Sequence, residues 1–230
     1  SILSAGLLAE VLHLNLNSSL GRAYIVPFNS KKKNADGTWS NVKVAQFQIG
    51  WKGYVEMMLR GNTPFISINA MEVREGEYLG RDSDTGEPVF KFITNDDERS
   101  SSPIIGYMAI YKLKSGFTKK VYMTKSQMKK HAETYSQAYK NDLKYGTKNS
   151  FWAKDDESFD EMAKKTMIRV IAKWCPLSSD VSYALEKDMT SSNDGKNYEY
   201  VDNSNEEIEF EDSRYATPSD DAIDVEDLKN

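Results

Sequence analysis

The sequence predicts an α+β fold, in which a largely antiparallel β-sheet is covered by packed helices. Several apolar or alternating runs have the composition of β-strands, and short turns such as those at residues 84–86 and 114–116 separate them. Other stretches carry apolar residues at helical spacing, most clearly residues 50–61 and 161–176. Hydrophobic residues make up 39% of the 230-residue chain and aromatic residues 11%, which is ample for a core.

The first part of the chain is expected to form a helix and then two strands. Residues 2–12 have a helical pattern. Its apolar face consists of Leu3, Leu7, Leu8 and Val11. Residues 21–28 and 41–49 have the pattern of strands, and the polar residues 30–40 between them are expected to form a loop.

The middle of the chain is expected to supply most of the sheet. A helix over residues 50–61 is expected to end at Gly61. Further strands are expected at residues 65–80, 88–92 and 103–123, the last of which contains a turn.

The next part of the chain is expected to form two helices joined by a loop. Thr124 is expected to cap a helix over residues 125–139, and a loop rich in Lys and Gly follows over residues 140–154. Ser158 is expected to cap a second helix, which Pro176 ends.

Charge divides the chain into a basic body and an acidic tail. A last short helix at residues 178–189 is expected to complete a core over residues 1–190, which carries 27 basic and 22 acidic residues. Residues 191–230 carry 3 basic and 13 acidic residues, a net charge of −10. Low hydrophobicity with high net charge predicts a disordered tail there, available to bind a partner.

The helix predicted over residues 161–176 has two distinct faces. Its apolar stripe consists of Ala163, Met167, Val170 and Trp174. Lys165, Arg169 and Lys173 stack at i, i+4 and i+8 on a separate stripe, where like charges repel one another. This arrangement suits a protein that holds a row of cations against a polyanion. The alternative is a basic face that meets only solvent.

Several classes of enzyme are disfavoured. The sequence has no GxxxxGK[ST] motif to bind a nucleoside triphosphate, so ATP-driven strand exchange is not expected. The single cysteine, Cys175, excludes an internal disulfide and is expected to be a core thiol. His13 and His131 are expected to have structural or solvent-facing roles. No catalytic residue and no metal ligand is therefore assigned.

Two further observations bear on location and on metal chemistry. No apolar run is long enough to span a membrane and no signal peptide is evident, so we expect a cytoplasmic protein with no membrane partner. Acidic clusters within residues 82–87, 96–98 and 155–157 leave a metal-dependent nuclease as a minor alternative. Acids are, however, ordinarily found in turns and at helix starts.

Three blocks of the sequence carry a resemblance to a known family. They are LGRAYIVPF at residues 20–28, QFQIGWKGYVEMMLR at residues 46–60 and DDESFDEMAKKTMIRVIAKWCP at residues 155–176. In residues, order and spacing these blocks resemble the RecT family of phage single-strand annealing proteins, over roughly residues 7–176. The insertion SKKKNADGTWSN at residues 30–41 and the acidic tail depart from the family pattern and leave the choice of partner open.

The resemblance implies a recombinase that works without ATP or catalytic chemistry. Such a protein coats single-stranded DNA, pairs it with a complementary strand, and assembles into rings or helical filaments around a sheet-and-helix core of the RecT and Red beta type. The resemblance also implies two partners, a phage exonuclease and the single-strand DNA-binding protein of the host. It further implies that residues 1–190 form the DNA-binding and oligomerisation core, and that the cytoplasm in which the protein acts is that of a bacterial host.

Candidate DNA contacts follow from the physics of annealing. A protein that pairs strands must hold phosphates and leave base edges open, so cations should outnumber base-reading groups. Lys125, Lys129 and Lys130 repeat the cationic spacing on a second helix, and the two helices are expected to face the same strand as walls of one groove. A finger that closes over DNA, or a solvated hairpin tip, is expected at Lys112, Lys114, Lys119 and Lys120. The complete set of candidates is Lys52, Lys112, Lys114, Lys119, Lys120, Lys125, Lys129, Lys130, Lys148, Trp152, Lys164, Lys165, Arg169 and Lys173.

Aromatic and amide side chains divide between the expected core and the expected surface. Aromatic residues at apolar spacing, expected in the core, are Phe47, Trp51, Tyr54 and Trp174. Trp152, in a polar loop, is the expected aromatic contact to DNA or to a neighbouring subunit, and at most an occasional wedge between bases is expected. Gln46 and Gln48 share a strand face and either bind the DNA backbone or hydrogen-bond at the sheet surface.

The sequence therefore predicts ATP-independent annealing of complementary single strands in phage homologous recombination. The expected partners are single-stranded DNA, the annealed duplex intermediate and further copies of the same chain. No cofactor is expected to be required, and Mg²⁺ is expected only to modulate DNA binding. A general single-strand coating protein and a metal-dependent nuclease are the alternatives.

Overall fold

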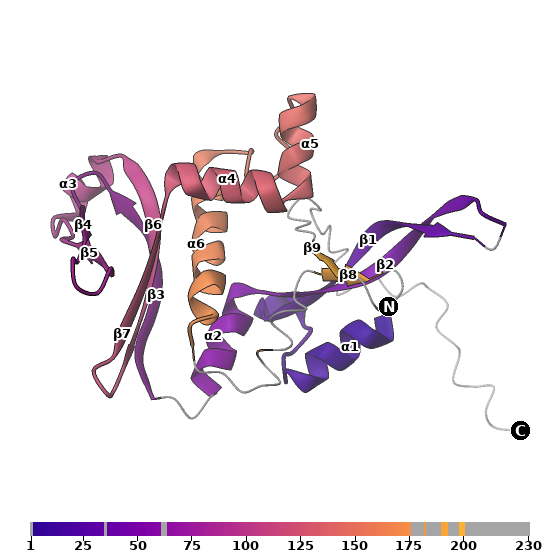
Figure 1. Cartoon of the computed structure of the whole chain (residues 1–230), viewed down its shortest axis with the longest axis horizontal. Helices are drawn as coiled ribbons and strands as arrows, with labels where there is room; N and C mark the ends of the chain where they lie inside the picture. Colours follow the sequence, from indigo (N-terminus) through magenta and orange to yellow (C-terminus); the bar gives the residue numbers. More distant parts are fainter. Residues whose placement is uncertain are drawn as a thin grey trace, which may run out of the picture.

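The computed structural model describes residues 2–34, 36–60, 64–175, 182, 190–192 and 198–200. The predicted α+β architecture is confirmed, with antiparallel strand pairs and several helices packed on them. Figure 1 shows a sheet and its helices on one side and a long hairpin that projects from the body on the other. In the described part of the chain, no helix combines the length and the apolar character that a bilayer span needs.

The first helix, α1 (Ile2–Val11), packs on the hairpin strands with its small residues. Ala5 and Ala9 are buried, whereas Leu3 is 84% exposed and Leu7 is 66% exposed. The predicted apolar face is therefore wrong for Leu3, Leu7 and Val11, and only Leu8 packs against the core. Alanines let the helix approach the strands closely, and this orientation leaves Leu3 and Leu7 facing outwards.

After a short 3₁₀ turn, η1 (Ser18–Leu20), the chain forms the hairpin of β1 (Ala23–Lys33) and β2 (Trp39–Ile49). The strands pair antiparallel along their whole length, from Ala23 opposite Ile49 to Lys33 opposite Trp39. The prediction of a loop over residues 30–40 is wrong, because both strands continue into it. Only a tight turn remains, in which the Thr38 carbonyl accepts a hydrogen bond from the Asn34 amide at 2.8 Å.

The second helix, α2 (Trp51–Arg60), follows β2 after one residue, and two glycines set how closely the start of this helix lies to residues 21–22, just before β1. A Cβ atom at Gly50 would lie 2.2 Å from the carbonyl oxygen of Gly21, and one at Gly53 would lie 2.2 Å from that of Arg22. Only glycine permits this approach. Tyr54 and Phe47 are buried as predicted, whereas Trp51 is 49% exposed and the prediction that it lies in the core is wrong.

A three-stranded antiparallel sheet has the order β3 (Phe65–Arg74), β6 (Ile104–Leu113) and β7 (Thr118–Thr124). The single strand predicted over residues 65–80 is two strands, because β4 (Tyr78–Arg81) leaves this sheet and pairs with β5 (Pro88–Phe90). A short helix, α3 (Asp96–Ser101), follows, where the sequence pattern predicts only an acidic turn or helix start.

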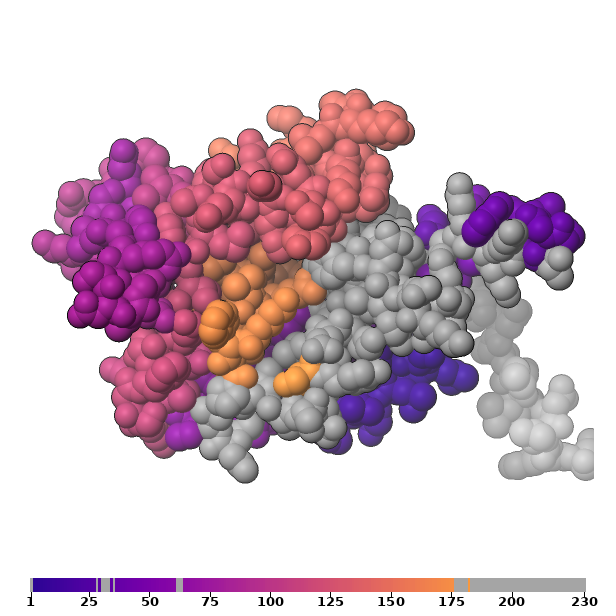
Figure 2. Space-filling view, in the orientation of Figure 1, coloured from indigo at the N-terminus to yellow at the C-terminus, as the bar shows by residue number. Residues whose placement is uncertain are grey.

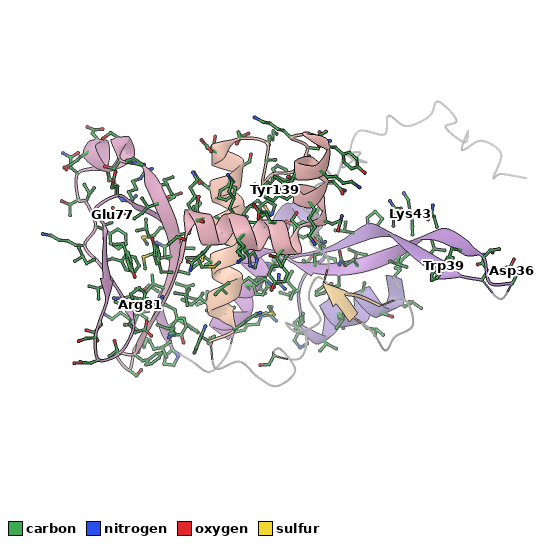
Figure 3. All side chains as sticks on the ribbon, turned by 45° about the horizontal axis from the view of Figure 1, so that its top comes forward. Asp36, Trp39, Lys43, Glu77, Arg81 and Tyr139 are labelled. Atoms are coloured by element: carbon green, nitrogen blue, oxygen red, sulfur yellow. The ribbon has the colours of Figure 1, made fainter. Side chains whose placement is uncertain are left out.

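A buried carboxylate joins the lobe formed by β4, β5 and α3 to the three-stranded sheet. Glu77 is fully buried and accepts hydrogen bonds from Arg99 Nε at 2.7 Å, from the Arg74 amide at 2.8 Å and from the Ile93 amide at 3.2 Å. Burial alone would raise the pKa of Glu77, but these donors outweigh burial and hold the pKa below its ordinary value. Figure 3 shows Glu77 inside the lobe, between its strands.

The helix predicted over residues 125–139 is broken by Ser136 into α4 (Lys125–Tyr135) and α5 (Gln137–Tyr145). The Ser136 hydroxyl accepts a hydrogen bond from the Tyr139 amide at 3.2 Å, so the same residue ends one helix and caps the next. The predicted cap at Thr124 is confirmed, and its capping box is completed by Gln127. Much of the predicted loop over 140–154 is therefore helical.

The longest helix, α6 (Asp156–Ala172), packs on β3, β6, β7 and α2. Its cap is Asp155, whose carboxylate accepts from the Ser158 amide at 2.6 Å, so the prediction of Ser158 as the cap is wrong. Ala163 and Met167 are buried as predicted, but Val170 is only partly buried. Because α6 contacts a sheet on one side and α2 on another, its buried band also includes Ile168 and Ile171.

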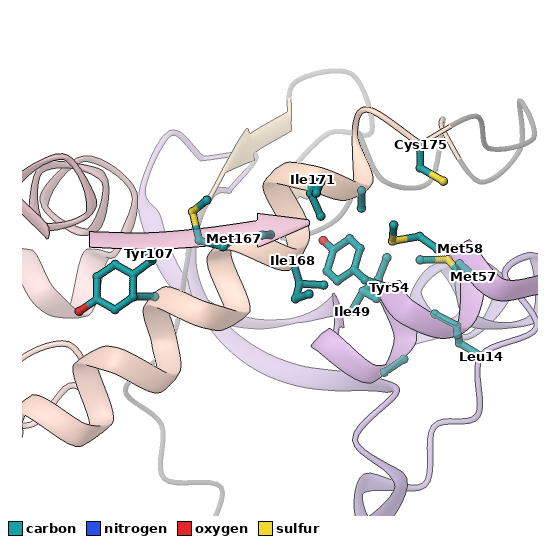
Figure 4. Close-up of a cluster of buried hydrophobic side chains, with 14 of the residues drawn as sticks. Leu14, Ile49, Tyr54, Met57, Met58, Tyr107, Met167, Ile168, Ile171 and Cys175 are labelled. Atoms are coloured by element: carbon teal, nitrogen blue, oxygen red, sulfur yellow. The ribbon is translucent and has the colours of Figure 1, made fainter. Parts of the chain in front are cut away.

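These elements share one apolar core. In Figure 4, Tyr54, Met57 and Met58 of α2 lie beside Ile168 and Ile171 of α6. Farther along α6, the Tyr107 hydroxyl of β6 donates to Asp160, and burial is the first cause of its raised pKa. The core thus fixes α6 between the sheet and the base of the hairpin.

Little of the chain beyond residue 175 is described. The backbone of β8 (Thr190–Ser192) pairs antiparallel with that of β9 (Tyr198–Tyr200), near β2, in a region where the sequence predicts a disordered tail. The predicted helix over residues 178–189, apart from residue 182, and most of the predicted acidic tail lie outside the described residues. The boundary at residue 190 stays a prediction.

Candidate nucleic-acid interface

The cationic stripe of α6 lies on the side of the helix that the core leaves uncovered. Lys165 and Arg169 are partly exposed, and Lys173, the residue that ends the helix, is exposed. Within the described residues neither Lys165 nor Lys173 forms an ion pair. Three cations on successive turns therefore run along about 12 Å of helix, at 1.5 Å per residue.

A histidine on α4 faces this stripe. His131 is partly buried, and its pKa is lowered to about 4, first by burial and then by the positive charges of Arg169 and Lys173. His131 therefore lies within electrostatic range of the C-terminal half of α6. In Figure 2, α6 forms a recessed floor with α4 along its upper rim and the end of the β6–β7 hairpin at its side.

The lysines of α4 lie on other flanks of that helix. At 100° per residue, Lys129 is displaced by about 160° from His131, and Lys125 by about 120°. The Lys125 ammonium instead lies 5.8 Å from the ring centre of Phe159, at the N-terminal end of α6. The two predicted lysine stripes therefore do not face each other, and Lys129 and Lys130 are exposed away from the α6 stripe.

The β6–β7 hairpin carries its four lysines in two different environments. Lys112 and Lys114 are exposed near the tip, where Gly116 adopts a positive φ of 90°. Lys119 points inward, where its Nζ lies 2.5 Å from Glu87 Oε1 and 4.3 Å from the ring centre of Trp174. Neighbouring residues of a strand point to opposite faces, so the partly exposed Lys120 lies on the other face of β7.

Lys164 is engaged by carboxylates. Its Nζ lies 3.0 Å from Glu72 Oε1 and 2.5 Å from Glu161 Oε1. Burial lowers the pKa of Lys164, but the two carboxylates outweigh burial and the net shift is upward. Lys164 therefore joins α6 to β3, and its predicted contact with DNA stays a prediction.

Trp152 lies in the core, so the prediction that its side chain contacts DNA or a neighbouring subunit is wrong. It is 3% exposed and packs edge-on against Phe159, with ring centres 5.2 Å apart. The loop that leads to Trp152 is anchored on Asp142. The Asp142 carboxylate accepts hydrogen bonds from the Ser150 hydroxyl at 2.5 Å and from the Thr147 hydroxyl at 2.5 Å. This anchoring, made by residues eight and five positions from Asp142, gives no periodic signal in the sequence.

Trp174 is the residue that sequence reasoning missed. The apolar spacing predicts it in the core, but it is 61% exposed at the end of α6. The helix ends at Ala172, two residues before Trp174, so the helical periodicity used to place Trp174 no longer applies there.

Two pairs of candidate residues remain, the lysines Lys52 and Lys148 and the amides Gln46 and Gln48. Lys52 is exposed on α2, with its Nζ 5.8 Å from the ring centre of Trp51, and Lys148 is exposed after α5. Gln46 is buried and accepts a hydrogen bond from Gln48 at 2.9 Å, which favours the interpretation of this pair as sheet-surface hydrogen bonding.

The surroundings of the acidic clusters and of Cys175 indicate structural roles. Asp82 accepts three hydrogen bonds within its own turn, and Asp155 caps α6. Among the described residues, no group of three or more His, Cys, Asp or Glu is placed to hold a metal ion. Cys175 is buried as predicted, and burial raises the pKa of its thiol to about 11, so the reactive thiolate is scarce at neutral pH.

Comparisons with known proteins agree with this arrangement. The chain is 35% identical over 192 residues to YqaK, an uncharacterised protein of Bacillus subtilis (strain 168), a match covering 83% of this chain and 57% of that protein. It is 30% identical over 188 residues to Protein RecT of Escherichia coli (strain K12), covering 82% of this chain and 62% of that protein. The matches thus span about three-fifths of each relative's length. Because the model of the RecT family also matches residues 1–209, the chain belongs to the RecT family.

Proposed function

We propose that this protein binds single-stranded DNA through its phosphates along the cationic stripe of α6 and pairs it with a complementary strand without ATP. The observation that carries the proposal is the row of Lys165, Arg169 and Lys173 on a rigid helix, beside a histidine that stays neutral at pH 7. Family membership supports a role in recombination or single-strand annealing.

The geometry suits a mode of binding that ignores base sequence. Lys and Arg at successive turns neutralise phosphates, which carry no base information. Lys165, Arg169 and Lys173 follow one another at intervals of four residues, where like charges repel, so a phosphate beside them relieves repulsion within the protein. The exposed Lys112 and Lys114 extend the positive surface at the tip of the β6–β7 hairpin.

Replacing Lys165, Arg169 and Lys173 by Gln tests the proposal. We expect weaker binding to oligo-dT and a flatter salt dependence, because each phosphate that the variant no longer neutralises lowers the slope by about 0.7 log units per log salt, roughly 2 in total. Fluorescence anisotropy at several salt concentrations measures both quantities.

A matched control removes the same formal charge elsewhere. Lys91, Lys140 and Lys144 are exposed, on the β4–β5 lobe and on α5, so their replacement by Gln should leave the salt slope unchanged. An equal decrease of affinity in the two triple variants would show that net charge, and not the α6 stripe, governs binding.

A general coating protein is the first alternative function. Pairing separates the two, because a coating protein protects single strands but slows their annealing, whereas this protein should accelerate it with no nucleotide added. A metal-dependent nuclease is the second alternative, and degradation of labelled DNA in Mg²⁺ would reveal it. In our proposal Mg²⁺ changes affinity only by competing for phosphates.

The same proposal includes assembly and partners. We propose that several copies line up along one strand, and that an exonuclease supplies the strand while a single-strand DNA-binding protein of the host hands it over. Sedimentation with and without oligo-dT tests assembly, and co-purification with each partner tests the remaining interactions.

A further inference from the structure

An exposed tryptophan follows the cationic stripe and is held in place by its backbone. The Trp174 amide donates to the Ile171 carbonyl at 3.0 Å, and the Trp174 carbonyl accepts from the Tyr111 hydroxyl at 2.9 Å. The next residue, Cys175, is buried. The indole is therefore presented to the surface by a fixed backbone, with 61% of the residue exposed.

An immobilised ammonium group lies against the indole. Lys119 Nζ is 4.3 Å from the ring centre of Trp174, well within the range of a cation–π interaction, and it also pairs with the Glu87 carboxylate at 2.5 Å. Because Lys119 contacts both the Glu87 carboxylate and the Trp174 ring, it holds the ring in one orientation. The large exposed fraction of Trp174 leaves room for a second planar group.

We infer that Trp174 stacks on one nucleobase of the bound strand, at the end of the α6 stripe. This inference rests on the proposed binding of single-stranded DNA along that stripe. Arg169 and Lys173 would hold phosphates within one to two helical turns of the indole, so a base attached to the same backbone reaches its ring. Stacking is tolerant of sequence, because every base has a π-face.

A nucleobase fits this position better than an apolar protein surface. Lys119 lies against the ring and is paired with Glu87, and Lys173 is the neighbouring residue in the chain. An apolar partner on the exposed face would desolvate this ion pair and Lys173 without offering them a countercharge. A nucleotide brings its own anion to the cations and its aromatic face to the indole. With one such tryptophan in each subunit, one base per subunit is stacked on protein while the others remain open for pairing.

Three substitutions separate stacking from packing. Trp174→Phe keeps an aromatic face, Trp174→Leu keeps apolar bulk without one, and Trp174→Ala removes both. We expect the Leu and Ala variants to bind oligo-dT roughly 5- to 100-fold more weakly at fixed salt, with an unchanged salt slope, and the Phe variant to keep most of the affinity. Trp39→Ala is the control, because Trp39 is 65% exposed on the hairpin, away from α6 (Figure 3).

Oligonucleotides with a single 2-aminopurine at successive positions provide an independent measurement. The wild type should change the fluorescence of this base at regularly spaced positions, and the Leu variant should abolish that pattern. If the wild type binds DNA and the Leu and Ala variants bind it with the same affinity, this inference alone is overturned. Absence of wild-type binding would overturn the proposed function as well. Failure of the Leu variant to self-associate, with DNA affinity per subunit unchanged, would assign Trp174 to an interface between copies and also overturn the inference.

Discussion

At the scale of single residues, His131 links the stability of the fold to pH. Its pKa in the folded protein is about 4, against an ordinary value of 6.5, so between these values the unfolded chain binds a proton that the native chain does not. Its contribution to stability is present above pH 6.5 and is lost as pH falls toward 4. Replacing His131 by Gln should therefore reduce the loss of unfolding free energy between pH 7 and pH 5 by about 1–2 kcal/mol, a range discounted because the imidazole is partly exposed. Urea unfolding of both proteins at the two pH values measures this, and identical pH dependence would contradict it.

At the scale of elements, the close approach of α2 to Arg22, at the entry to β1, depends on glycine. Ala at Gly53 would place Cβ 2.2 Å from the Arg22 carbonyl oxygen, so we expect Gly53→Ala to lower the free energy of unfolding by about 1–3 kcal/mol, despite the better helix propensity of Ala. Gly6→Ala in α1 is the matched control, because no atom lies within 4 Å of its added Cβ, and it should stabilise the protein by up to about 1 kcal/mol. Chemical denaturation ranks the two variants. Destabilisation of similar size at both positions would show that the approach of α2 to β1 is not the cause.

At the scale of the whole molecule, the proposed binding of phosphates along the α6 stripe allows strand pairing to be distinguished from simple coating. If phosphates are held and base edges stay open, complementary strands added in succession should give a complex more resistant to salt than either strand alone, since base pairing and further phosphate contacts are added within one assembly. A preformed duplex should bind poorly, because reshaping B-form DNA over roughly 20–30 base pairs costs several kcal/mol. Filter retention over a salt titration compares the three substrates. Equal retention of preformed and sequentially annealed duplex would instead favour a nonspecific basic DNA-binding protein.

Local signals predict much of this fold, and long-range contacts account for what they miss. Thr124 is predictable as a cap because capping depends on neighbours three residues away. The burial of Trp152 depends on the hydrogen bonds by which Asp142 anchors the loop before Trp152. The exposure of Trp174 depends on where α6 ends. Neither cause produces a periodic pattern in the sequence. The cations of α6 can be grouped from their spacing alone, whereas the direction of the α4 lysines requires the packing of one helix across another.

The projecting hairpin of β1 and β2 also bears on solubility. Among the described residues it has no third strand, so each strand presents a row of backbone donors and acceptors to which a foreign strand can add. Pro27 removes one donor from β1, and the sequence of the same strand contains three consecutive lysines, at residues 31–33, whose like charges disfavour pairing with a second such ribbon. The sequence near the tip therefore protects the exposed edges against aggregation, whatever the hairpin touches in the assembled protein.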